Sequence, residues 1–287
     1  MRLSGHTKPF AVLGHPIGHT LSPVMHNAAF RALELDAIYL AFDVAPERLM
    51  NVLPAMADMG FGGVNLTVPL KEVAFRGLAA LDKSARDLGA VNTVACLPDG
   101  LKGYNTDGYG FLSSTREAFG VGVEGLSVFI LGCGGAGRAV ALTCADRGAA
   151  RLAVTDQDET RSARLAGEIA SFAPSVSVSS VPAGAALWRE ASAGADLVVQ
   201  ATPVGMKPED PPLLGADAFR EGQRAYDLVY MYPETPFMKA AREGGAHAAN
   251  GLGMLMHQGA RAFSIWTGRE APEDTMRSAL EHEVYGN

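Results

Sequence analysis

The sequence predicts an α/β protein with two domains, each built on a mainly parallel sheet that helices cover. Strand-like and helix-like segments alternate along the chain, which is the pattern of such sheets. The length of 287 residues suits two domains. The composition, with 48% hydrophobic residues and 33 glycines, provides enough apolar side chains for a real core and enough glycines for many tight turns.

The first unit begins with short apolar segments that alternate with helical ones. Residues 10–14 predict a buried strand that runs into a Gly/Pro-rich loop over residues 14–20. Ser22 followed by Pro23 is typical of a helix N-cap and a first helical position, and apolar residues at helical spacing follow. Next we expect a strand over residues 38–42, a helix over residues 49–59 and a strand over residues 63–68.

The second unit begins near residue 113 and repeats the alternation. The apolar run over residues 126–131 predicts a fully buried strand, which leads through a glycine-rich loop into a helix over residues 138–147. Residues 252–283 are helical in pattern. The other expected elements are strands over residues 152–155, 175–181, 197–201 and 225–229 and a helix over residues 161–172.

Charge and composition exclude several classes of function. The net charge is −7 with no basic run, which argues against nucleic acid as a partner but leaves an anionic small molecule possible. No apolar run reaches the roughly 18 residues that a membrane span needs, and the N-terminus lacks a secretory signal. Neither the three cysteines nor the seven histidines show metal-ligand spacing. We therefore expect a cytoplasmic protein without a metal.

The glycine-rich loop carries the strongest chemical signal. Gly132, Gly134 and Gly137 form the pattern G-x-G-x-x-G between a predicted strand and a predicted helix, with Gly135 and Ala136 inside it. The first glycine permits a tight turn, the second lets a pyrophosphate approach the backbone, and the third lets the helix pack on the strand. The alternative is a glycine-rich turn without a ligand. The strand–loop–helix context favours dinucleotide binding.

An acidic residue bears on which dinucleotide binds. Asp156 ends the second strand of this unit, where it can accept hydrogen bonds from the adenosine ribose hydroxyls. A 2′-phosphate there would meet Asp156, Asp158 and Glu159, with Arg161 as the one nearby cation. Like charges oppose binding, so this chemistry favours NAD over NADP. The alternative is a solvated acidic turn that never contacts a cofactor.

Polar residues of the first unit can hold an anionic, hydroxylated ligand. Thr20 and Ser22 stand at a loop-to-helix junction, where hydroxyls and free backbone N–H groups can bind a carboxylate, although capping alone accounts for Ser22. Thr67 and Lys71 follow a predicted strand, at the edge where open α/β sheets bind ligands. By itself, Lys71 is better explained as a solvated surface lysine than as a ligand-binding residue.

Asn92 and Asp107 stand in two further polar turns. Such turns favour Asn and Asp whether or not a ligand binds. With Lys71, they would bring an amide, a carboxylate and an ammonium to one hydroxylated ring.

These segments together resemble the shikimate dehydrogenase family, and they occur in the family's order over nearly the whole chain. The matching stretches are residues 14–23, 65–71, 89–93 and 105–108, the glycine loop, and residues 201–206, 227–230 and 251–255. The resemblance implies a substrate domain over residues 1–112 completed by C-terminal helices over residues 253–287, with a Rossmann domain over residues 113–252 between them.

The resemblance also implies the reaction, which is reversible hydride transfer between a nicotinamide cofactor and C3 of shikimate or 3-dehydroshikimate. In the family this step belongs to aromatic amino acid biosynthesis on the route to chorismate. The partner would be this small molecule alone, bound by a monomer or a homodimer.

Site residues follow from motif position. Lys71 and Asp107 fall on the family's catalytic pair, with Lys71 as an acid/base or an electrostatic anchor for the carbonyl oxygen. Thr20 and Ser22 would hold the substrate carboxylate. The other implied contacts with the ring are Thr67, Asn92, Tyr230 and Gln258, and the implied cofactor contacts beyond the glycine loop and Asp156 are Gln157, Arg161, Thr202 and Gly251.

Two departures from the family pattern concern specificity. Thr20 stands where many members have serine, and its methyl narrows the carboxylate pocket, which bears on the choice between shikimate and quinate. Gln157 stands where NADP-dependent members carry an arginine for the 2′-phosphate, so this chain is similar to the NAD-preferring quinate/shikimate branch. An NAD-dependent quinate dehydrogenase and a non-catalytic sensor of cofactor or metabolite are the alternatives, and a sensor has no need of Lys71 and Asp107.

Cys133 lies inside the glycine loop. It is interpreted as a small space-filling residue. The alternative is a redox-sensitive thiol whose pKa the helix N-terminus lowers.

Overall fold

The computed structural model describes residues 3–207 and 209–286, and the chain divides into two compact units. Unit 1 comprises Met1–Gly110 and Leu255–Asn287, and unit 2 comprises Phe111–Met254. The chain passes between them within two helices, α5 (Asp107–Phe119) and α10 (Leu252–Thr267). The predicted α/β class with two sheets is confirmed.

Unit 1 contains a six-stranded mixed sheet. Its strands are β1 (Lys8–Gly14), β2 (Ala37–Asp43), β3 (Gly63–Leu66), β4 (Ala80–Leu81), β5 (Thr93–Leu97) and β6 (Gly100–Tyr104). They lie in the order β2-β1-β3-β5-β6-β4. β1 pairs in parallel with β2 and β3, and β4 with β6, whereas β5 is antiparallel to both of its neighbours.

Alternation along β1 divides the core of unit 1 between the two faces of its sheet. Ala11 and Leu13 face one side, where they join a buried apolar cluster with α2 and α3. Phe10 faces the other side and packs against Phe30 of α1 and Trp266 of α10. The helices of unit 1 besides α10 and the start of α5 are α1 (Ser22–Ala32), α2 (Leu49–Asp58), α3 (Lys71–Gly77), α4 (Lys83–Leu88) and α11 (Glu273–Tyr285), with a short 3-10 turn over Pro46–Arg48.

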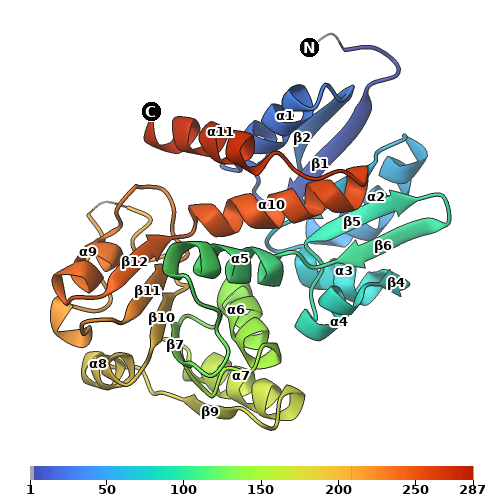
Figure 1. The fold of residues 1–287 in the computed structure, drawn as a ribbon. Helices are drawn as coiled ribbons and strands as arrows, with labels where there is room; N and C mark the ends of the chain where they lie inside the picture. Colours follow the sequence, from blue (N-terminus) through green and yellow to red (C-terminus); the bar gives the residue numbers. More distant parts are fainter. Residues whose placement is uncertain (1–2, 208, 287) are drawn as a thin grey trace. The chain divides into compact units, whose positions relative to one another are not determined.

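The C-terminal helices belong to this second face. Figure 1 shows α11, in red, beside the blue helix α1, although the two lie at opposite ends of the sequence. Trp266 also donates its indole N–H to the Val94 carbonyl of β5, at 3.0 Å. The C-terminal segment therefore completes the core of unit 1.

Several details of unit 1 differ from the sequence prediction, including β4 and α4, which were not predicted. β3 ends at Leu66 rather than at residue 68, because the chain turns before Pro69. Ser22 is the first residue of α1 and not its N-cap; Leu21 precedes the helix and no side chain caps it. The β5–β6 hairpin was not predicted, although its turn, Pro98-Asp99-Gly100, has a composition typical of turns.

Unit 2 contains a six-stranded sheet that is parallel throughout. Its strands are β7 (Ser127–Leu131), β8 (Arg151–Thr155), β9 (Ser177–Ser180), β10 (Leu197–Gln200), β11 (Arg224–Asp227) and β12 (His247–Asn250). Their order is β12-β11-β10-β7-β8-β9, and all five pairings are parallel. Numbered within the unit this is the order 3-2-1-4-5-6, which is the Rossmann fold, with its topological switch point between β7 and β10.

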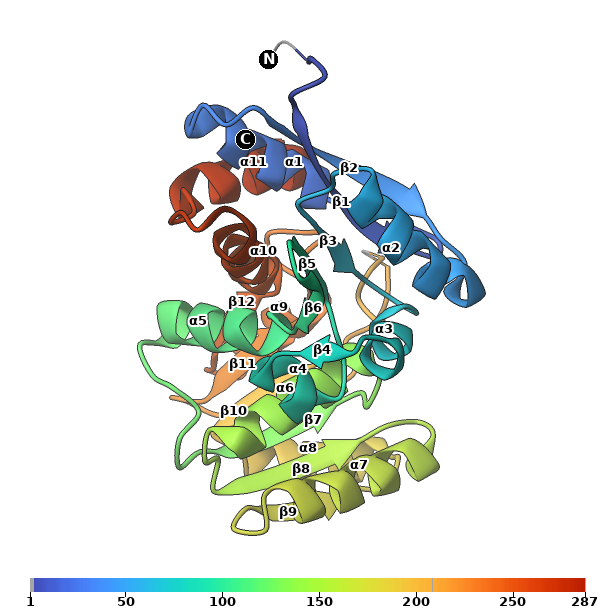
Figure 2. The same ribbon diagram turned by 90° about the vertical axis from the view of Figure 1, so that its right-hand side faces the viewer.

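Helices cover this sheet and connect its strands. They are α6 (Gly135–Asp146), α7 (Glu159–Phe172), α8 (Ala185–Ala193) and α9 (Pro236–Glu243), with the greater part of α5 and a 3-10 turn over Ala216–Ala218. In Figure 2, α7 runs alongside β8 and β9. α6 begins at Gly135 rather than at the predicted residue 138, so the helix starts inside the glycine motif.

A buried carboxylate organises the carboxyl ends of β10 and β11. Asp227 accepts hydrogen bonds from the hydroxyl of Thr235 (2.6 Å), the backbone N–H of Val229 (3.0 Å) and the side-chain amide of Gln200 (3.3 Å). Burial raises the pKa of Asp227 from its ordinary value of 3.8 to about 6, and the hydrogen bonds from Thr235 and Val229 only partly oppose this. Asp227 is thus a fully buried carboxyl group that ionises near pH 6.

This raised pKa predicts a specific dependence of stability on pH. The folded protein keeps a proton on Asp227 up to about pH 6, whereas the unfolded chain loses it near pH 3.8. The contribution of this proton is fully present below pH 3.8 and is lost as the pH rises through about 6, which amounts to about 3 kcal/mol. The Asp227→Asn substitution removes this loss, so the variant should gain stability relative to the parent protein between pH 4.5 and pH 7.5.

Urea unfolding of both proteins across that range measures the difference. The matched control is Asp217→Asn, which changes an exposed carboxylate of the same unit. A stability difference between the Asp227→Asn variant and the parent that does not change with pH would contradict the prediction.

Candidate active site

The carboxyl ends of β1 and β3 place the first group of predicted residues in unit 1. Thr67 directly follows β3, and its backbone N–H donates to the Leu13 carbonyl of β1 at 2.9 Å. A Cβ atom at Gly14 would lie 2.6 Å from the methyl group of Thr67, so only glycine permits this approach. The chain then turns into α3, whose first residue is Lys71.

The centre of the site is an ion pair between Lys71 and Asp107. The Lys71 Nζ atom lies 2.7 Å from Asp107 Oδ2, and the two side chains are 24% and 11% exposed. Asp107 is the first residue of α5, where the helix dipole stabilises a negative charge. The backbone carbonyl of Lys71 accepts from the N–H of Val91 at 3.0 Å, which fixes the start of α3 to the Val91-Asn92 turn. The sequence prediction that Lys71 and Asp107 converge is therefore met.

Asn92 holds the carboxylate of this pair. Its side-chain amide donates to Asp107 Oδ1 at 2.8 Å and to the Thr106 hydroxyl at 2.9 Å, and it lies 3.5 Å from Gln258 Oε1. Its carbonyl oxygen accepts from the Thr106 backbone N–H at 2.8 Å. With only 2% exposure, the Asn92 side chain makes its contacts inside unit 1, while the Lys71 amine keeps some access to solvent.

Asn65 extends this network and was not singled out from the sequence. It accepts from the Tyr39 hydroxyl at 2.6 Å and donates to the Thr93 hydroxyl at 3.0 Å. Thr93 in turn donates to Asn92 at 2.9 Å. The available signal was a polar residue in the interior of an apolar strand, because a buried amide requires partners.

The remaining predicted substrate contacts fall into three places. Thr20 accepts from the backbone N–H of Ser22 at 3.3 Å, so the hydroxyl of Thr20 and not that of Ser22 binds the backbone at the start of α1. Gln258 lies on α10 and donates to the Leu255 carbonyl at 2.8 Å. Tyr230 belongs to unit 2, where burial raises the pKa of its phenol.

The glycine motif of unit 2 has the geometry that a pyrophosphate requires. Gly132 has φ +99°, a conformation that favours glycine, and a Cβ at Gly137 would lie 1.9 Å from the Gly132 carbonyl oxygen. A Cβ at Gly134 or Gly135 would meet no atom within 4 Å. The first turn of α6 presents backbone N–H groups without partners inside the helix, which favour an anion. The loop therefore fits a dinucleotide.

Asp156 is tied to this loop. One carboxylate oxygen accepts from the Cys133 N–H at 2.8 Å, and the other accepts from the Asp158 N–H at 3.0 Å. Arg161 lies 3.3 Å from Asp158, and both side chains are about half exposed. A carboxylate oxygen has further acceptor capacity, so Asp156 can still bind a ribose hydroxyl.

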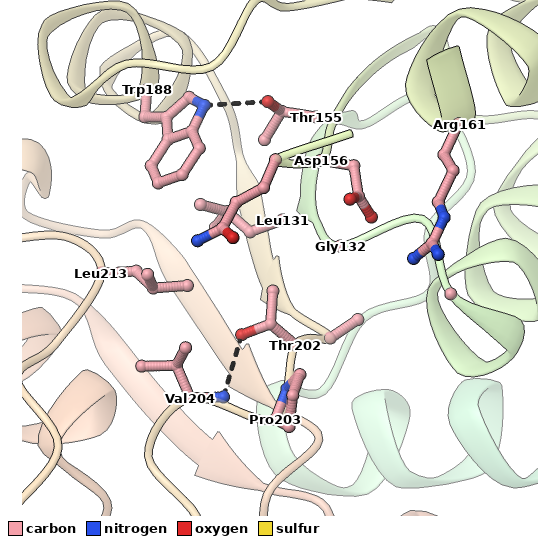
Figure 3. Close-up of a pocket in the computed structure, with 13 residues that line it drawn as sticks. Leu131, Gly132, Thr155, Asp156, Arg161, Trp188, Thr202, Pro203, Val204 and Leu213 are labelled. Atoms are coloured by element: carbon pink, nitrogen blue, oxygen red, sulfur yellow. Dashed lines mark hydrogen bonds between the residues drawn. The ribbon is translucent and has the colours of Figure 1, made fainter. Parts of the chain in front are cut away.

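A cavity of about 270 Å³ follows the switch point of the unit 2 sheet. Figure 3 shows Asp156 and Arg161 on one side of it, with Trp188, Val204 and Leu213 on the other. Predicted cofactor residues that line it are Gly132, Gly134, Asp156, Gln157, Arg161 and Thr202. Gly135, Ala136 and Gly137 follow in the first turn of α6. Gly251 is required by packing, since its Cβ would lie 2.3 Å from the Leu228 carbonyl oxygen.

The structure contradicts the idea of a reactive thiol at Cys133. Burial and the neighbouring Asp156 carboxylate raise the pKa of this thiol to about 12, although Arg161 opposes them. Cys133 Sγ instead lies 3.4 Å from the Thr155 carbonyl oxygen. The helix N-terminus does not overcome these two effects, which favours the interpretation of Cys133 as a space-filling residue.

The described residues include neither a membrane-spanning helix nor a metal-binding cluster. No helix in residues 3–207 or 209–286 is long and apolar enough to cross a membrane. Within the same part of the chain, no three His, Cys, Asp or Glu side chains gather in a way that could hold a metal ion.

Comparisons with known proteins agree with this geometry. The model of the shikimate dehydrogenase substrate binding domain matches residues 12–94, and that of the shikimate 5'-dehydrogenase C-terminal domain matches residues 251–281. The NADP(+) shikimate dehydrogenase of Methanopyrus kandleri is 43% identical over 98% of this chain and 97% of its own. The chain belongs to the shikimate dehydrogenase family.

Solved structures of the family have the same fold. Shikimate 5-dehydrogenase from Listeria monocytogenes, in complex with shikimate and NAD, is 34% identical with a TM-score of 0.91 and covers 98% of both chains. Quinate dehydrogenase from Corynebacterium glutamicum, in complex with NAD, is 31% identical with a TM-score of 0.87 over 96% of this chain and 98% of its own. The protein is therefore an oxidoreductase that acts on a CH–OH group with a nicotinamide dinucleotide.

Two glycines of the loop allow a matched test of its geometry. The Gly137→Ala substitution forces a methyl group against the Gly132 carbonyl and should destabilise the protein by about 1–3 kcal/mol while weakening cofactor binding. The Gly134→Ala substitution places its methyl group in open space beside the cavity, at a φ of −69°. It should weaken cofactor binding and leave the melting temperature nearly unchanged.

Thermal denaturation and calorimetric titration with the dinucleotide measure the two effects separately. An unchanged melting temperature for the Gly137→Ala variant would show that the loop can relax and that the close approach is not required.

Proposed function

We propose that this protein interconverts 3-dehydroshikimate and shikimate by reversible hydride transfer with a nicotinamide cofactor. The observation that carries the proposal is the Lys71–Asp107 ion pair, held at 2.7 Å by a buried amide network and still open to solvent at the amine. Unit 1 would bind the substrate and unit 2 the dinucleotide. Two relatives support the assignment. The M. kandleri protein is named for this activity, and the L. monocytogenes structure holds shikimate.

Lys71 would act on the substrate oxygen. Reduction of the C3 ketone places negative charge on that oxygen, and an ammonium group can neutralise it by donating a hydrogen bond or the proton itself. In the oxidation direction, the neutral form of the amine, which proton donation leaves behind, would accept the hydroxyl proton. The bound nicotinamide supplies or receives the hydride at carbon. The cation stands at the N-terminus of α3, where the helix dipole disfavours a positive charge, and Asp107 provides the opposite charge that orients it.

Asn92 and Asp107 would position this amine rather than take a proton themselves. The two Asp107 oxygens each have a defined partner, Lys71 on one side and Asn92 on the other. A substrate hydroxyl could bind beside them through the remaining acceptor capacity of Asp107. Thr67 and Gln258 lie on the same unit and complete the proposed ring contacts, while Thr20 and Ser22 would receive the carboxylate.

We propose NAD as the preferred cofactor. Asp156 and the neighbouring Asp158 and Glu159 form an acidic stretch at the end of β8, and Arg161 is already paired with Asp158. A 2′-phosphate would have to displace or share that pairing, whereas a free 2′-hydroxyl can donate to Asp156. The NAD complexes of the L. monocytogenes and C. glutamicum enzymes support this choice, and the NADP(+) name of the M. kandleri relative opposes it.

Quinate is the second candidate substrate. The specific observation in its favour is the likeness to the C. glutamicum quinate dehydrogenase. Thr20, whose methyl group narrows the proposed carboxylate site, bears on the choice between the two substrates. Quinate carries the same carboxylate and the same class of secondary hydroxyl, so the same Lys71 chemistry would serve.

One assay tests substrate and cofactor together. The absorbance of the reduced nicotinamide is followed while shikimate and quinate are each combined with NAD and with NADP. We expect the highest kcat/KM for shikimate with NAD. Higher kcat/KM with NADP would overturn the interpretation that Asp156 and Gln157 favour NAD. Higher kcat/KM for quinate than for shikimate would make the protein a quinate dehydrogenase. No turnover in any of the four combinations would overturn the proposed reaction.

Two matched variants of Gln157 test the proposed preference for NAD. Gln157→Arg supplies a cation for a 2′-phosphate and should raise the ratio of kcat/KM for NADP to that for NAD on the order of 10-fold, because a charge-assisted hydrogen bond is worth about 1.5–3 kcal/mol. Gln157→Ala removes the same side chain without adding charge and should leave the ratio near that of the parent.

Substitution of Lys71 tests the proposed proton donor. Lys71→Ala should lower kcat on the order of 10²-fold or more while changing the KM for the cofactor little, because the amine stabilises charge that develops only in the transition state. Steady-state kinetics measure both constants. Lys83→Ala, which changes an exposed lysine of α4, is the control and should keep the parental kcat. A near-normal kcat for Lys71→Ala would remove Lys71 from the mechanism.

A further inference from the structure

The cavity of unit 2 is chemically divided along its length. Near the glycine loop and Asp156 it presents backbone N–H groups and a carboxylate, which suit phosphates and ribose hydroxyls. At its other end it is lined by the side chains of Trp188, Val204 and Leu213, none of which carries a charge. Figure 3 shows the Trp188 ring pointing into the space above Leu213. This end suits a flat, uncharged group with two apolar faces.

A hydrogen bond to the last residue of β8 holds the indole of Trp188 in place. Its N–H, which is the one polar group of the ring, donates to the Thr155 hydroxyl at 2.8 Å. Thr155 in turn donates to the Val181 carbonyl at 2.8 Å and is 1% exposed. The Thr155 side chain therefore cannot rotate without losing its hydrogen bonds to both Trp188 and Val181. With its polar edge satisfied, the indole can offer a ring face to a ligand.

The anchor also sets where the ring lies relative to the ribose site. Thr155 is the last residue of β8, and the next residue is Asp156. One strand end therefore positions both the carboxylate proposed for the ribose and the aromatic ring beside it. In a nucleotide, the base is attached directly to the ribose, so the base of a nucleotide whose ribose binds Asp156 lies within reach of the neighbouring ring.

We propose that Trp188 is the wall against which the adenine of the dinucleotide stacks. The inference rests on the proposed dinucleotide function and names the residue that selects for the base. Adenine has the flat aromatic faces that this end of the cavity suits, and stacking of a base on an aromatic side chain contributes substantially to binding. The competing role for Trp188 is packing alone, since its ring also contacts the apolar cluster of unit 2.

The fluorescence of Trp188 gives a direct test. The chain has two tryptophans, so Trp266→Phe leaves Trp188 as the only one, and Trp188→Phe leaves Trp266. Titration with ADP-ribose, which carries adenine but no nicotinamide, should quench the emission of the Trp266→Phe protein to saturation. The emission of the Trp188→Phe protein should not change. Nicotinamide mononucleotide, which lacks adenine, should not produce the saturable quenching.

Affinity provides the second readout. Calorimetry with ADP-ribose should show a loss on the order of 10-fold or more for Trp188→Ala and a much smaller loss for Trp188→Phe, which keeps an aromatic face. Leu187→Ala, which changes an exposed neighbour on α8, is the control and should bind as the parent does. A packing role would lower the melting temperature of Trp188→Ala without a selective loss of ADP-ribose affinity.

The outcomes separate this inference from the proposed function. Saturable ADP-ribose binding that leaves Trp188 emission unchanged, or equal affinity of Trp188→Ala and parent, would overturn the stacking role and leave dinucleotide binding standing. Absence of ADP-ribose binding to the parent protein would overturn both.

Discussion

The ion pair between Lys71 and Asp107 is the interaction on which the site in unit 1 depends. It joins the first residue of α3 to the first residue of α5, two helix starts separated by 36 positions in the chain. A lysine at a helix N-terminus opposes the helix dipole, and a partly buried ammonium without a partner is costly. The Asp107 carboxylate offsets both effects. A lysine at the first position of α3 breaks a local rule of helix stability, and residues that break such rules are expected at functional sites, in agreement with the proposed role of this pair.

The amide network behind the pair makes its geometry rigid. Asn92 fixes one Asp107 oxygen, Asn65 connects the Asn92 turn to β3, and Tyr39 connects Asn65 to β2. Because each of these groups is buried, loss of any one would leave an unsatisfied partner. Burial raises the pKa of the Tyr39 phenol well above 10, so it stays protonated and can donate to Asn65. The orientation of Lys71 is thus determined by residues on several strands rather than by its own helix.

The sequence predicted the elements whose signals are local. The glycine motif, the strand before it and Asp156 after it were recognised because each requires particular residues at fixed spacing. Lys71 and Asp107 were singled out as a pair because they fall in motifs that occur in the family's order. The antiparallel hairpin of unit 1 and the helices α8 and α9 were missed, since short elements with mixed composition carry weak periodicity.

Interactions between distant segments were the part that sequence reasoning could not supply. For Cys133, the alternative of a redox-sensitive thiol came from a local feature, a helix N-terminus, which lowers a thiol pKa. Burial and Asp156, which come from the folded environment, raise the pKa of this thiol instead. Trp188 was overlooked for the same reason. Its position depends on a hydrogen bond to Thr155, 33 residues earlier, and nothing in its own neighbourhood of the sequence indicates that bond.

Asp156 shows how structure and specificity share one side chain in unit 2. Its two oxygens already hold the N–H groups of Cys133 and Asp158, so it shapes the glycine loop as well as the proposed ribose site. Removing this carboxylate would loosen the loop proposed to receive the pyrophosphate and would therefore weaken the binding of either dinucleotide. Gln157 lines the same cavity on an exposed part of the chain. A change of cofactor preference is consequently easier to reach through Gln157 than through Asp156, whose replacement would alter the binding of the part that NAD and NADP have in common.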